Sequence, residues 1–172
     1  RYRRPLVEQD TVRYQFFAKQ DEIVAHPTLG NVAMVIRADG LSLHYLDPIN
    51  SARVVYSLDS ESMVKVESDA FKSGTSPLKD NEWNDCVVTV REGKADLTLN
   101  GTLLYSLPLE SGTGTPFGFF RYKHQKCEIR NIVLSGAWPS SIKESDVANW
   151  TSKNKTYWQK LPVDDSQPRV SD

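Results

Sequence analysis

The fold is decided by residues 82–101, Glu-Trp-Asn-Asp-Cys-Val-Val-Thr-Val-Arg-Glu-Gly-Lys-Ala-Asp-Leu-Thr-Leu-Asn-Gly, which predict two strands and two turns. Successive side chains of a strand point to opposite faces. The apolar residues alternate accordingly in both strands: Cys86, Val88 and Val90, then Ala95, Leu97 and Leu99. Pairing Val90 with Ala95 places both sets on one face, because this register keeps the apolar residues together. The same register leaves three residues in water: Arg91, Asp96 and Thr98.

Two turns close these strands into hairpins. Residues 91–94 form the first turn, and Asn100-Gly101 forms the second. Asn and Gly both tolerate the positive φ that a type I′ turn requires, so the second hairpin is tight. This stretch predicts an architecture, but it contains no residue pattern that is typical of an activity.

Length and composition are those of one globular domain with a tail. The chain has 172 residues, of which 39% are hydrophobic and 25% are charged. The formal net charge of −1 leaves no basic surplus to release counterions from phosphates, which excludes a nucleic-acid partner. The longest apolar runs are far shorter than the ~20 residues that span a bilayer, so no membrane span is predicted.

The start of the chain and its cysteines bear on its origin. The chain begins with Arg1 rather than Met, so we expect a processed product or a domain of a longer protein. Cys86 and Cys127 both fall on predicted inward strand faces, which permits but does not require a disulfide. The Asn-x-Ser/Thr glycosylation pattern, which arises readily by chance, begins at three positions: Asn100, Asn149 and Asn154.

Short strands recur along the chain, at residues 12–18, 32–37, 41–46, 53–57, 63–68, 115–122 and 126–134. Residues 26–30 are expected to be irregular because Pro27 and Gly30 interrupt them, and residues 70–81 are expected to form a long loop. Short strands with closely spaced turns are typical of an antiparallel sandwich or barrel. We therefore expect a β-sandwich domain over residues 1–139 and a tail over residues 140–172, with one short helix near residues 144–150 and then disorder.

Four motifs resemble the closing half of concanavalin A-like and laminin G-like jelly rolls: Trp83-Asn84, Leu97-Thr98-Leu99-Asn100-Gly101, Phe117-Gly118-Phe119-Phe120 and Ile129-Arg130-Asn131-Ile132. This resemblance implies an all-β, concanavalin A-like jelly-roll sandwich of two antiparallel sheets with little helix. Other motifs are similar to an uncharacterised bacterial family, a domain of unknown function found in planctomycete-type proteins: Tyr2-Arg3-Arg4-Pro5-Leu6, His26-Pro27-Thr28-Leu29-Gly30, Leu43-His44-Tyr45-Leu46-Asp47, Pro77-Leu78-Lys79, and Arg130-Asn131 followed by Gly136-Ala137-Trp138-Pro139.

The family resemblance runs from about Tyr2 to Pro139, with the motifs in the family's order. It implies one module of a larger exported or envelope-associated bacterial protein, with other domains of that protein as partners and no established catalytic residues. The sequence departs from the family pattern at Tyr45, where we expect Trp, and at Ala137, where we expect Asp. If an aromatic ring at 45 or an acidic group at 137 binds a ligand in relatives, that role is altered here.

Carbohydrate binding is the leading functional hypothesis, because aromatic rings stack on sugars while amides and carboxylates bind their hydroxyl groups. The candidate ligand-binding residues lie at strand ends and in turns: His44, Tyr45, Asp47, Arg121, Tyr122 and His124. The competing interpretation is that Tyr45 and Tyr122 cap the core with their hydroxyl groups in water. A purely structural domain that packs against its neighbours is a further alternative.

A glycoside hydrolase of the jelly-roll type is the enzymatic alternative, and it needs two carboxylates that flank the scissile bond. The spacing offers Asp59 with Glu61, and Glu67 with Asp69, each two residues apart and so on one face of a strand. Neither pair has the third acidic residue or the apolar interleaving of jelly-roll glucanases. A non-catalytic module is therefore the preferred prediction.

The sequence predicts no cofactor. Asp39, Asp47 and Asp59 form no compact oxygen-ligand loop, although calcium stays an open alternative because lectins of this fold use it. The histidines are too scattered for a zinc site, and Cys127 with His124 is a coincidental pair rather than a nucleophile with its base.

Three further side chains have predicted structural roles. Trp83 and Trp138 are assigned to the core and its edge. Asn131 is expected on the inward face of its strand, where its buried amide bonds backbone groups, while Arg130 faces outward.

Overall fold

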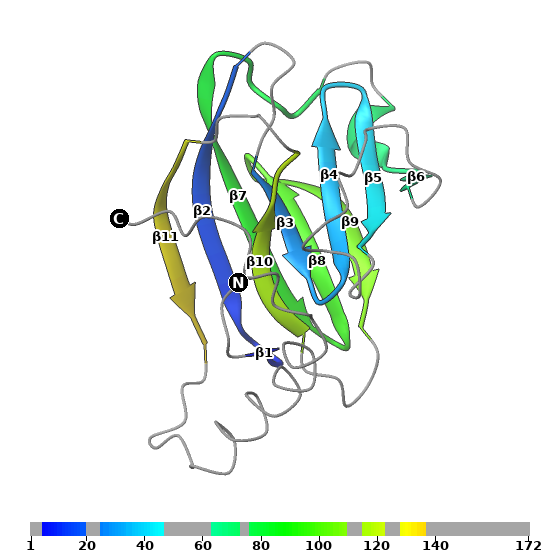
Figure 1. Cartoon of the computed structure of the whole chain (residues 1–172), viewed down its shortest axis with the longest axis vertical. Helices are drawn as coiled ribbons and strands as arrows, with labels where there is room; N and C mark the ends of the chain where they lie inside the picture. Colours follow the sequence, from blue (N-terminus) through cyan, green and yellow to red (C-terminus); the bar gives the residue numbers. More distant parts are fainter. Residues whose placement is uncertain are drawn as a thin grey trace, which may run out of the picture. The chain divides into compact units, whose positions relative to one another are not determined.

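The computed structural model describes residues 5–19, 25–46, 63–72, 76–109, 115–122 and 128–136, which form two antiparallel sheets (Figure 1). The six-stranded sheet has the order β1 (Pro5–Leu6), β10 (Thr115–Phe120), β3 (His26–Leu29), β4 (Val32–Arg37), β5 (Gly40–Tyr45) and β6 (Met63–Val66). The five-stranded sheet has the order β11 (Ile129–Ser135), β2 (Thr11–Ala18), β7 (Glu82–Arg91), β8 (Lys94–Leu99) and β9 (Thr102–Pro108). The chain crosses repeatedly between the sheets, as in a jelly roll.

The inner faces of the two sheets meet in one hydrophobic core. Tyr14 of β2 lies at its centre and is fully buried. Its ring contacts Phe117 and Phe119 of the opposite sheet, with ring centroids 6.3 and 4.8 Å away. Its hydroxyl donates to the carbonyl of Ala25 at 3.1 Å. These contacts confirm the predicted sandwich of two antiparallel sheets.

Both hairpins of residues 82–101 are confirmed. Val90 pairs with Ala95, as the apolar pattern predicts, and the apolar residues of β7 and β8 lie in the core. Asn100 and Gly101 have φ values of 49° and 83°, in the left-handed region that a type I′ turn requires. The local pattern therefore fixed the register correctly.

Most other predicted strands are present with shifted ends. The strands expected at residues 12–18, 32–37, 41–46, 63–68, 115–122 and 126–134 correspond to β2, β4, β5, β6, β10 and β11. Within the expected loop of residues 70–81, the described part carries one helical turn, η1 (Asp69–Phe71). No described helix has the length and apolarity that crossing a membrane requires. The strand expected at 53–57 and the tail at 140–172 lie outside the described residues.

The prediction of an irregular segment at residues 26–30 is wrong, because residues 26–29 form β3 in the middle of the six-stranded sheet. Pro27 lacks an N–H group, and the ladder to β4 is correspondingly short, with Thr28 opposite Ala33 and Leu29 opposite Val32. Beyond Pro27, the Nδ1 atom of His26 accepts the N–H of Ile36 at 3.2 Å. The His26 side chain thus takes the place of a backbone acceptor for the N–H of Ile36.

The prediction that Asn131 is buried is also wrong. The pairing of β11 with β2 shifts between Arg130 and Val133, and Asn131 has a φ of 53°. This β-bulge reverses the alternation of β11, so Leu134 packs against the core while Asn131 is exposed. Arg130 faces outward, as predicted.

Two other predicted positions differ from the structure. Asp96 is 6% exposed rather than in water, because its carboxylate accepts bonds from Arg91 Nε and the Ser106 hydroxyl. Trp83 is not a core residue. It precedes Asn84, which is buried, and therefore lies on the outer face of the five-stranded sheet.

Candidate functional site

Two of the predicted ligand residues come together, and both are buried. His44 and Tyr122 are 0% and 6% exposed, and the His44 Nδ1 and the Tyr122 hydroxyl share a 3.2 Å hydrogen bond. The rings of Phe120 and His26 pack against this pair. Burial lowers the pKa of His44. Burial, together with the charges of Arg37 and His44, lowers the pKa of His26 to about 3. This histidine cluster (His26, His44, Phe120 and Tyr122) leaves its two predicted ligand residues little surface for a sugar, and the Tyr122 hydroxyl is not in water.

The other predicted ligand residues are exposed or lie outside the described residues. Tyr45 follows His44 in β5 and so projects from the opposite face of the sheet, where it is 48% exposed. Arg121 is exposed just beyond β10. Asp47 and His124 lie outside the described residues. The buried His44 and Tyr122 are therefore separated from Tyr45, which lies on the opposite face of the sheet from His44.

The candidate carboxylate pair Glu67 and Asp69 is not arranged for glycoside hydrolysis. Asp69 lies in η1 rather than in a strand, and its carboxylate binds the Lys72 ammonium at 2.6 Å. This hydrogen bond and the positive charge of Lys72 lower the pKa of Asp69, whereas a general acid needs a raised pKa. The alternative pair, Asp59 and Glu61, lies outside the described residues.

The described residues offer neither a metal centre nor a reactive thiol. They contain no group of three His, Cys, Asp or Glu side chains placed to hold a metal ion. Cys86 is a free thiol at the centre of the core, and burial raises its pKa to about 12. A protonated, inaccessible thiol is not a nucleophile. Cys127, with which the sequence permits but does not require a disulfide, lies outside the described residues.

The best-defined group of exposed functional side chains lies on the outer face of the five-stranded sheet. Trp83 of β7 is partly buried there, edge-on to Phe17 of β2 with ring centroids 5.6 Å apart. The guanidinium of Arg130, from β11, lies over the Trp83 ring with its Cζ atom 3.8 Å from the ring centroid. This distance is within the range of a cation–π interaction. We call Trp83 and Arg130 the stacked pair.

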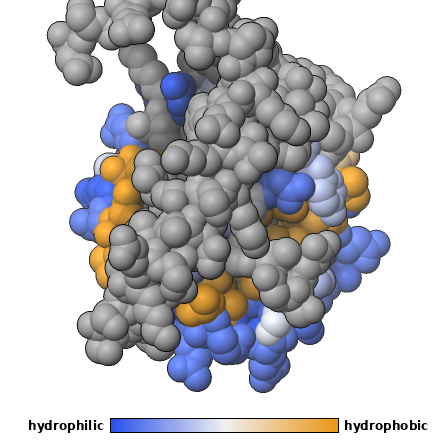
Figure 2. Space-filling view, turned by 60° about the horizontal axis from the view of Figure 1, so that its bottom comes forward, coloured by the Kyte–Doolittle hydropathy of each residue, from blue (hydrophilic) through white to orange (hydrophobic). Residues whose placement is uncertain are grey.

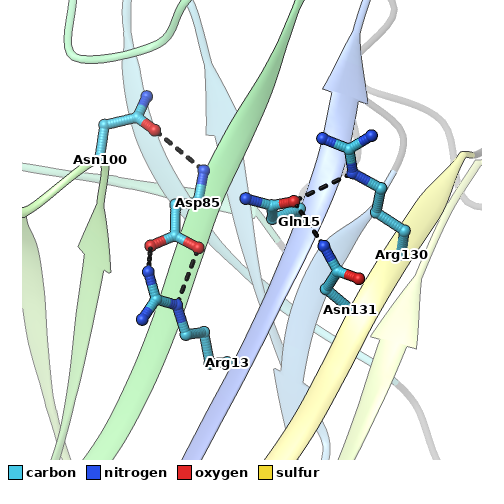
Figure 3. Close-up of polar contacts among 6 residues, drawn as sticks. All are labelled: Arg13, Gln15, Asp85, Asn100, Arg130 and Asn131. Atoms are coloured by element: carbon cyan, nitrogen blue, oxygen red, sulfur yellow. Dashed lines mark hydrogen bonds and ion pairs between the residues drawn. The ribbon is translucent and has the colours of Figure 1, made fainter.

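A row of hydrogen-bonding side chains crosses the sheet beside the stacked pair (Figure 3). Gln15 Oε1 accepts from Arg130 Nε at 3.0 Å and from Asn131 Nδ2 at 2.9 Å. Arg13 reaches from β2 to β7 and binds both carboxylate oxygens of Asp85. The hydrogen bond and the charge of Asp85 raise the pKa of Arg13. We call Arg13, Gln15, Asp85 and Asn131 the polar row; together with the stacked pair it forms the candidate site.

Two side-chain amides, those of the buried Asn84 and the half-buried Asn100, hold this part of the sheet in place. Asn84 Oδ1 accepts from Lys79 N–H at 2.8 Å and from Asn100 Nδ2 at 2.7 Å, while Asn84 Nδ2 donates to the Lys79 and Glu82 carbonyls. Asn100 Oδ1 in turn accepts the N–H of Asp85 at 2.9 Å, a bond drawn in Figure 3. The backbone of Trp83 and Asp85 is therefore anchored on both sides of Asn84.

Most of the chain matches a known protein family. Residues 1–141 match the model of a family described as a domain of unknown function, DUF1583_N. The chain belongs to the DUF1583_N family. No curated protein sequence is similar to the chain. The prediction of a domain-of-unknown-function family is thereby confirmed, and the candidate site lies on a DUF1583_N domain.

Solved structures with a similar fold include galectins. A variant of human galectin-16 has a TM-score of 0.52 and 8% identity, over 77% of this DUF1583_N chain and 91% of the galectin. CG-16, a homodimeric agglutinin from chicken liver, has a TM-score of 0.51 and 9% identity, over 77% and 96%. At such identities the likeness establishes the jelly-roll fold alone. The function of this DUF1583_N domain therefore depends on its own side chains.

The sequence contained a signal for the candidate site that the assignment of Trp83 to the core overlooked. Cys86, Val88 and Val90 define the inward positions of β7, so Trp83 and Asp85 occupy outward positions by alternation. That Arg130 would reach Trp83 was not predictable, because β11 and β7 are separated by β2 and are joined only by the sheet order.

Proposed function

We propose that this domain is a non-catalytic binding module for glycans, and that the glycan binds on the outer face of the five-stranded sheet. The observation that carries this proposal is the adjacency of a partly buried tryptophan, Trp83, to a row of oriented amide, guanidinium and carboxylate groups on one exposed sheet face. Sugar recognition needs this combination, since a sugar presents apolar C–H surface and many hydroxyl groups together.

The residues of the site have complementary tasks. The part of the Trp83 ring that Arg130 leaves uncovered receives the apolar face of a sugar, and the Phe17 ring, which meets Trp83 edge-on, holds the tryptophan in place. Gln15 and Asn131 present the amide groups that are not used between them, and Asp85 and Arg13 offer ionic partners to hydroxyl groups. Because the backbone around Asn84 is anchored, these groups are preorganised and little ordering entropy is lost on binding.

The carboxylates of this face favour binding over hydrolysis. Asp85 is held by Arg13 through both oxygens, and the buried Asp96 accepts from Arg91 and Ser106. A glycosidase needs one carboxylate that carries a proton and another that is free to attack or to activate water. Paired carboxylates of this kind orient a ligand instead.

The resemblance to a module of a larger, exported bacterial protein agrees with this proposal, because glycans are abundant outside the cell envelope. One of the proteins with a similar fold is an agglutinin, which supports the proposal. The earlier candidate surface around Tyr45 and Arg121 is a competing location for the glycan site, since both residues are exposed.

Domain packing is the second candidate function, and exposed aliphatic side chains favour it. Ile132 and Val133 on the edge strand β11 are 57% and 54% exposed. Figure 2 shows patches of hydrophobic residues beside hydrophilic ones on the coloured part of one face. On β11 the exposed Ile132 and Val133 adjoin two polar residues of the site, Arg130 and Asn131, whereas a stable domain interface normally has a continuous apolar centre, so we rank packing below glycan binding.

A glycan array with three proteins tests the proposal: the wild type, Trp83→Ala and Tyr45→Ala. We expect the wild type to bind, Trp83→Ala to lose at least tenfold in affinity, and Tyr45→Ala to bind as the wild type does. Circular dichroism and thermal unfolding establish that each variant is folded, and Trp83→Phe serves as a milder second variant. Absence of binding to every glycan would overturn the function, whereas loss only in Tyr45→Ala would move the site.

A further inference from the structure

We infer that Arg130 is an anion-binding residue, and that the ligand of the outer face is a sugar that carries a negatively charged group. This inference rests on the proposed glycan-binding function and specifies its ligand class. It comes from the unusual bonding of Arg130 compared with the other arginine of the site.

The Arg130 guanidinium is oriented by neutral partners from two other strands. Its Nε donates to Gln15 Oε1 at 3.0 Å, and its plane lies over the Trp83 ring. Within the described part of the chain it forms no ion pair, and its two terminal amino groups form no hydrogen bond. A guanidinium held in this way keeps its full charge and presents a fixed fork of donors, which matches a carboxylate or a sulfate.

Arg13 provides the contrast within the same site. It is bound by both oxygens of Asp85, so its charge is neutralised by its own sheet. The same interaction occupies Asp85, which is the carboxylate of the polar row and is not used by Arg130. Within the stacked pair and the polar row, Arg130 is therefore the guanidinium that has no carboxylate partner.

The bulge in β11 contributes to this arrangement. Asn131 donates to the same Gln15 oxygen that receives Arg130 Nε, so this oxygen is fixed by two donors. Because Arg can only donate, the orientation of the Gln15 amide follows from the network itself. The Gln15 Nε2 group is then directed away from this oxygen and is a further donor for an anionic ligand.

The carboxylate of Glu128 repels an anionic ligand at this site. Glu128 is exposed and precedes Arg130 by two residues, so an extended chain places it on the same side roughly 6.5 Å away along the strand direction. Its carbonyl accepts the N–H of Phe17 at 3.1 Å, which keeps its backbone beside the site. Glu128 forms no ion pair with Arg130 among the described residues, so its charge weakens the binding of an anion without occupying the guanidinium.

Three gluco-configured tetrasaccharides test the inference: a glucuronate tetrasaccharide, its methyl ester, and a sulfated glucose tetrasaccharide. Titration calorimetry compares the wild type with Arg130→Met, Arg130→Lys, Glu128→Gln and the control Lys94→Met. Lys94 is an exposed cation on the β7–β8 hairpin, so its loss changes the net charge as Arg130→Met does. The glucuronate and sulfate arms distinguish the two sources of negative charge.

We expect the wild type to bind at least one anionic probe at least tenfold more tightly than the neutral ester. Arg130→Met removes this preference, Arg130→Lys retains only part of it, Glu128→Gln strengthens anion binding about twofold, and Lys94→Met changes nothing. Binding that is equal for anionic and neutral probes, or absent for all three, overturns the inference. In either case, glycans bound on the array in a Trp83-dependent way leave the proposed function intact. If the array is also empty, the proposed function fails as well.

Discussion

At the scale of single residues, Asn84 is the side chain whose hydrogen-bonding capacity is most completely used. It is fully buried, and its amide makes four hydrogen bonds, two as donor and two as acceptor. Four is also the ordinary capacity of a side-chain amide. The side chain that follows Trp83 therefore fixes the loop at Lys79 and the turn at Asn100, and through them the backbone beneath the candidate site.

Replacing Asn84 by Leu tests this role. Leu has a similar size but leaves the Lys79 and Glu82 groups without their partner, so we expect the free energy of unfolding to fall by about 3 kcal/mol. Urea unfolding measures the change. Asn31→Ala is the matched control, because Asn31 is exposed, and it should change stability by less than about 0.5 kcal/mol. A loss of similar size in both variants would contradict the assigned role.

At the scale of strands, β11 supplies Arg130 and Asn131 to the site and contains a β-bulge. Its bulge places Asn131 at a φ of 53°, where Asn and Gly are tolerated and β-branched residues are strained. The bulge presents Arg130 and Asn131 together to Gln15. Regular alternation would place Arg130 and Asn131 on opposite faces of the strand.

Two substitutions separate the backbone conformation of the bulge from the hydrogen bond of Asn131. Asn131→Gly keeps the positive φ and loses only the exposed amide, so we expect a change below about 0.5 kcal/mol in the free energy of unfolding. Asn131→Val has to adopt the same φ with a β-branched side chain, and we expect a loss of about 1–2 kcal/mol. Thermal unfolding compares the two variants. If Gly were the more destabilising, the side-chain bond rather than the bulge would govern this position.

The strands also show what the sequence could predict. The hairpins of residues 82–101 were predictable because their register depends on neighbours close in the chain, such as Val90 and Ala95. β3 was not, because Pro27 looks like a strand breaker, and only the structure shows that His26 accepts the N–H of Ile36 where the ladder to β4 ends. The bulge of β11 was not predictable either, since one extra residue reverses the faces and leaves no mark on the apolar pattern.

The candidate site was predictable only in part. Residue types suited to sugars were recognised, but His44 and Tyr122 turned out to bond each other inside the protein, and Tyr45 projects from the other side of its strand. Aromatic and polar residues near strand ends occur in cores and sites alike, so the sequence alone does not separate these uses. Three-dimensional neighbours such as Trp83, Gln15 and Arg130 come from three strands that are distant in sequence.

At the scale of the whole molecule, the two sheets have different chemistry on their outer faces. The five-stranded sheet presents exposed charges that are paired across strands, whereas the six-stranded sheet buries two histidines, His26 and His44. The fold is shared with galectins, yet a shared fold does not transfer a site. The buried histidines make the stability of the whole domain depend on pH.

The direction of this dependence follows from His26. Its pKa is about 3 in the folded protein and 6.5 in the ordinary, unfolded state, so between these values the unfolded chain binds more protons. The free energy of unfolding should therefore be constant, for this group, above pH 6.5 and should fall by up to about 1.4 kcal/mol per pH unit below it. The lowered pKa of His44 acts in the same direction.

The variant His26→Asn tests the contribution of His26. The Oδ1 atom of Asn can occupy nearly the position of His Nδ1 and accept the N–H of Ile36, but the Asn side chain does not titrate. We expect the variant to be less stable at pH 7, because the imidazole ring no longer fills its place, and to lose less stability on acidification. Urea unfolding at several pH values between 7 and about 4.5 measures both effects. Equal losses in the two proteins over this range would show that His26 is not buried in its neutral form, since only a neutral imidazole can accept the Ile36 bond.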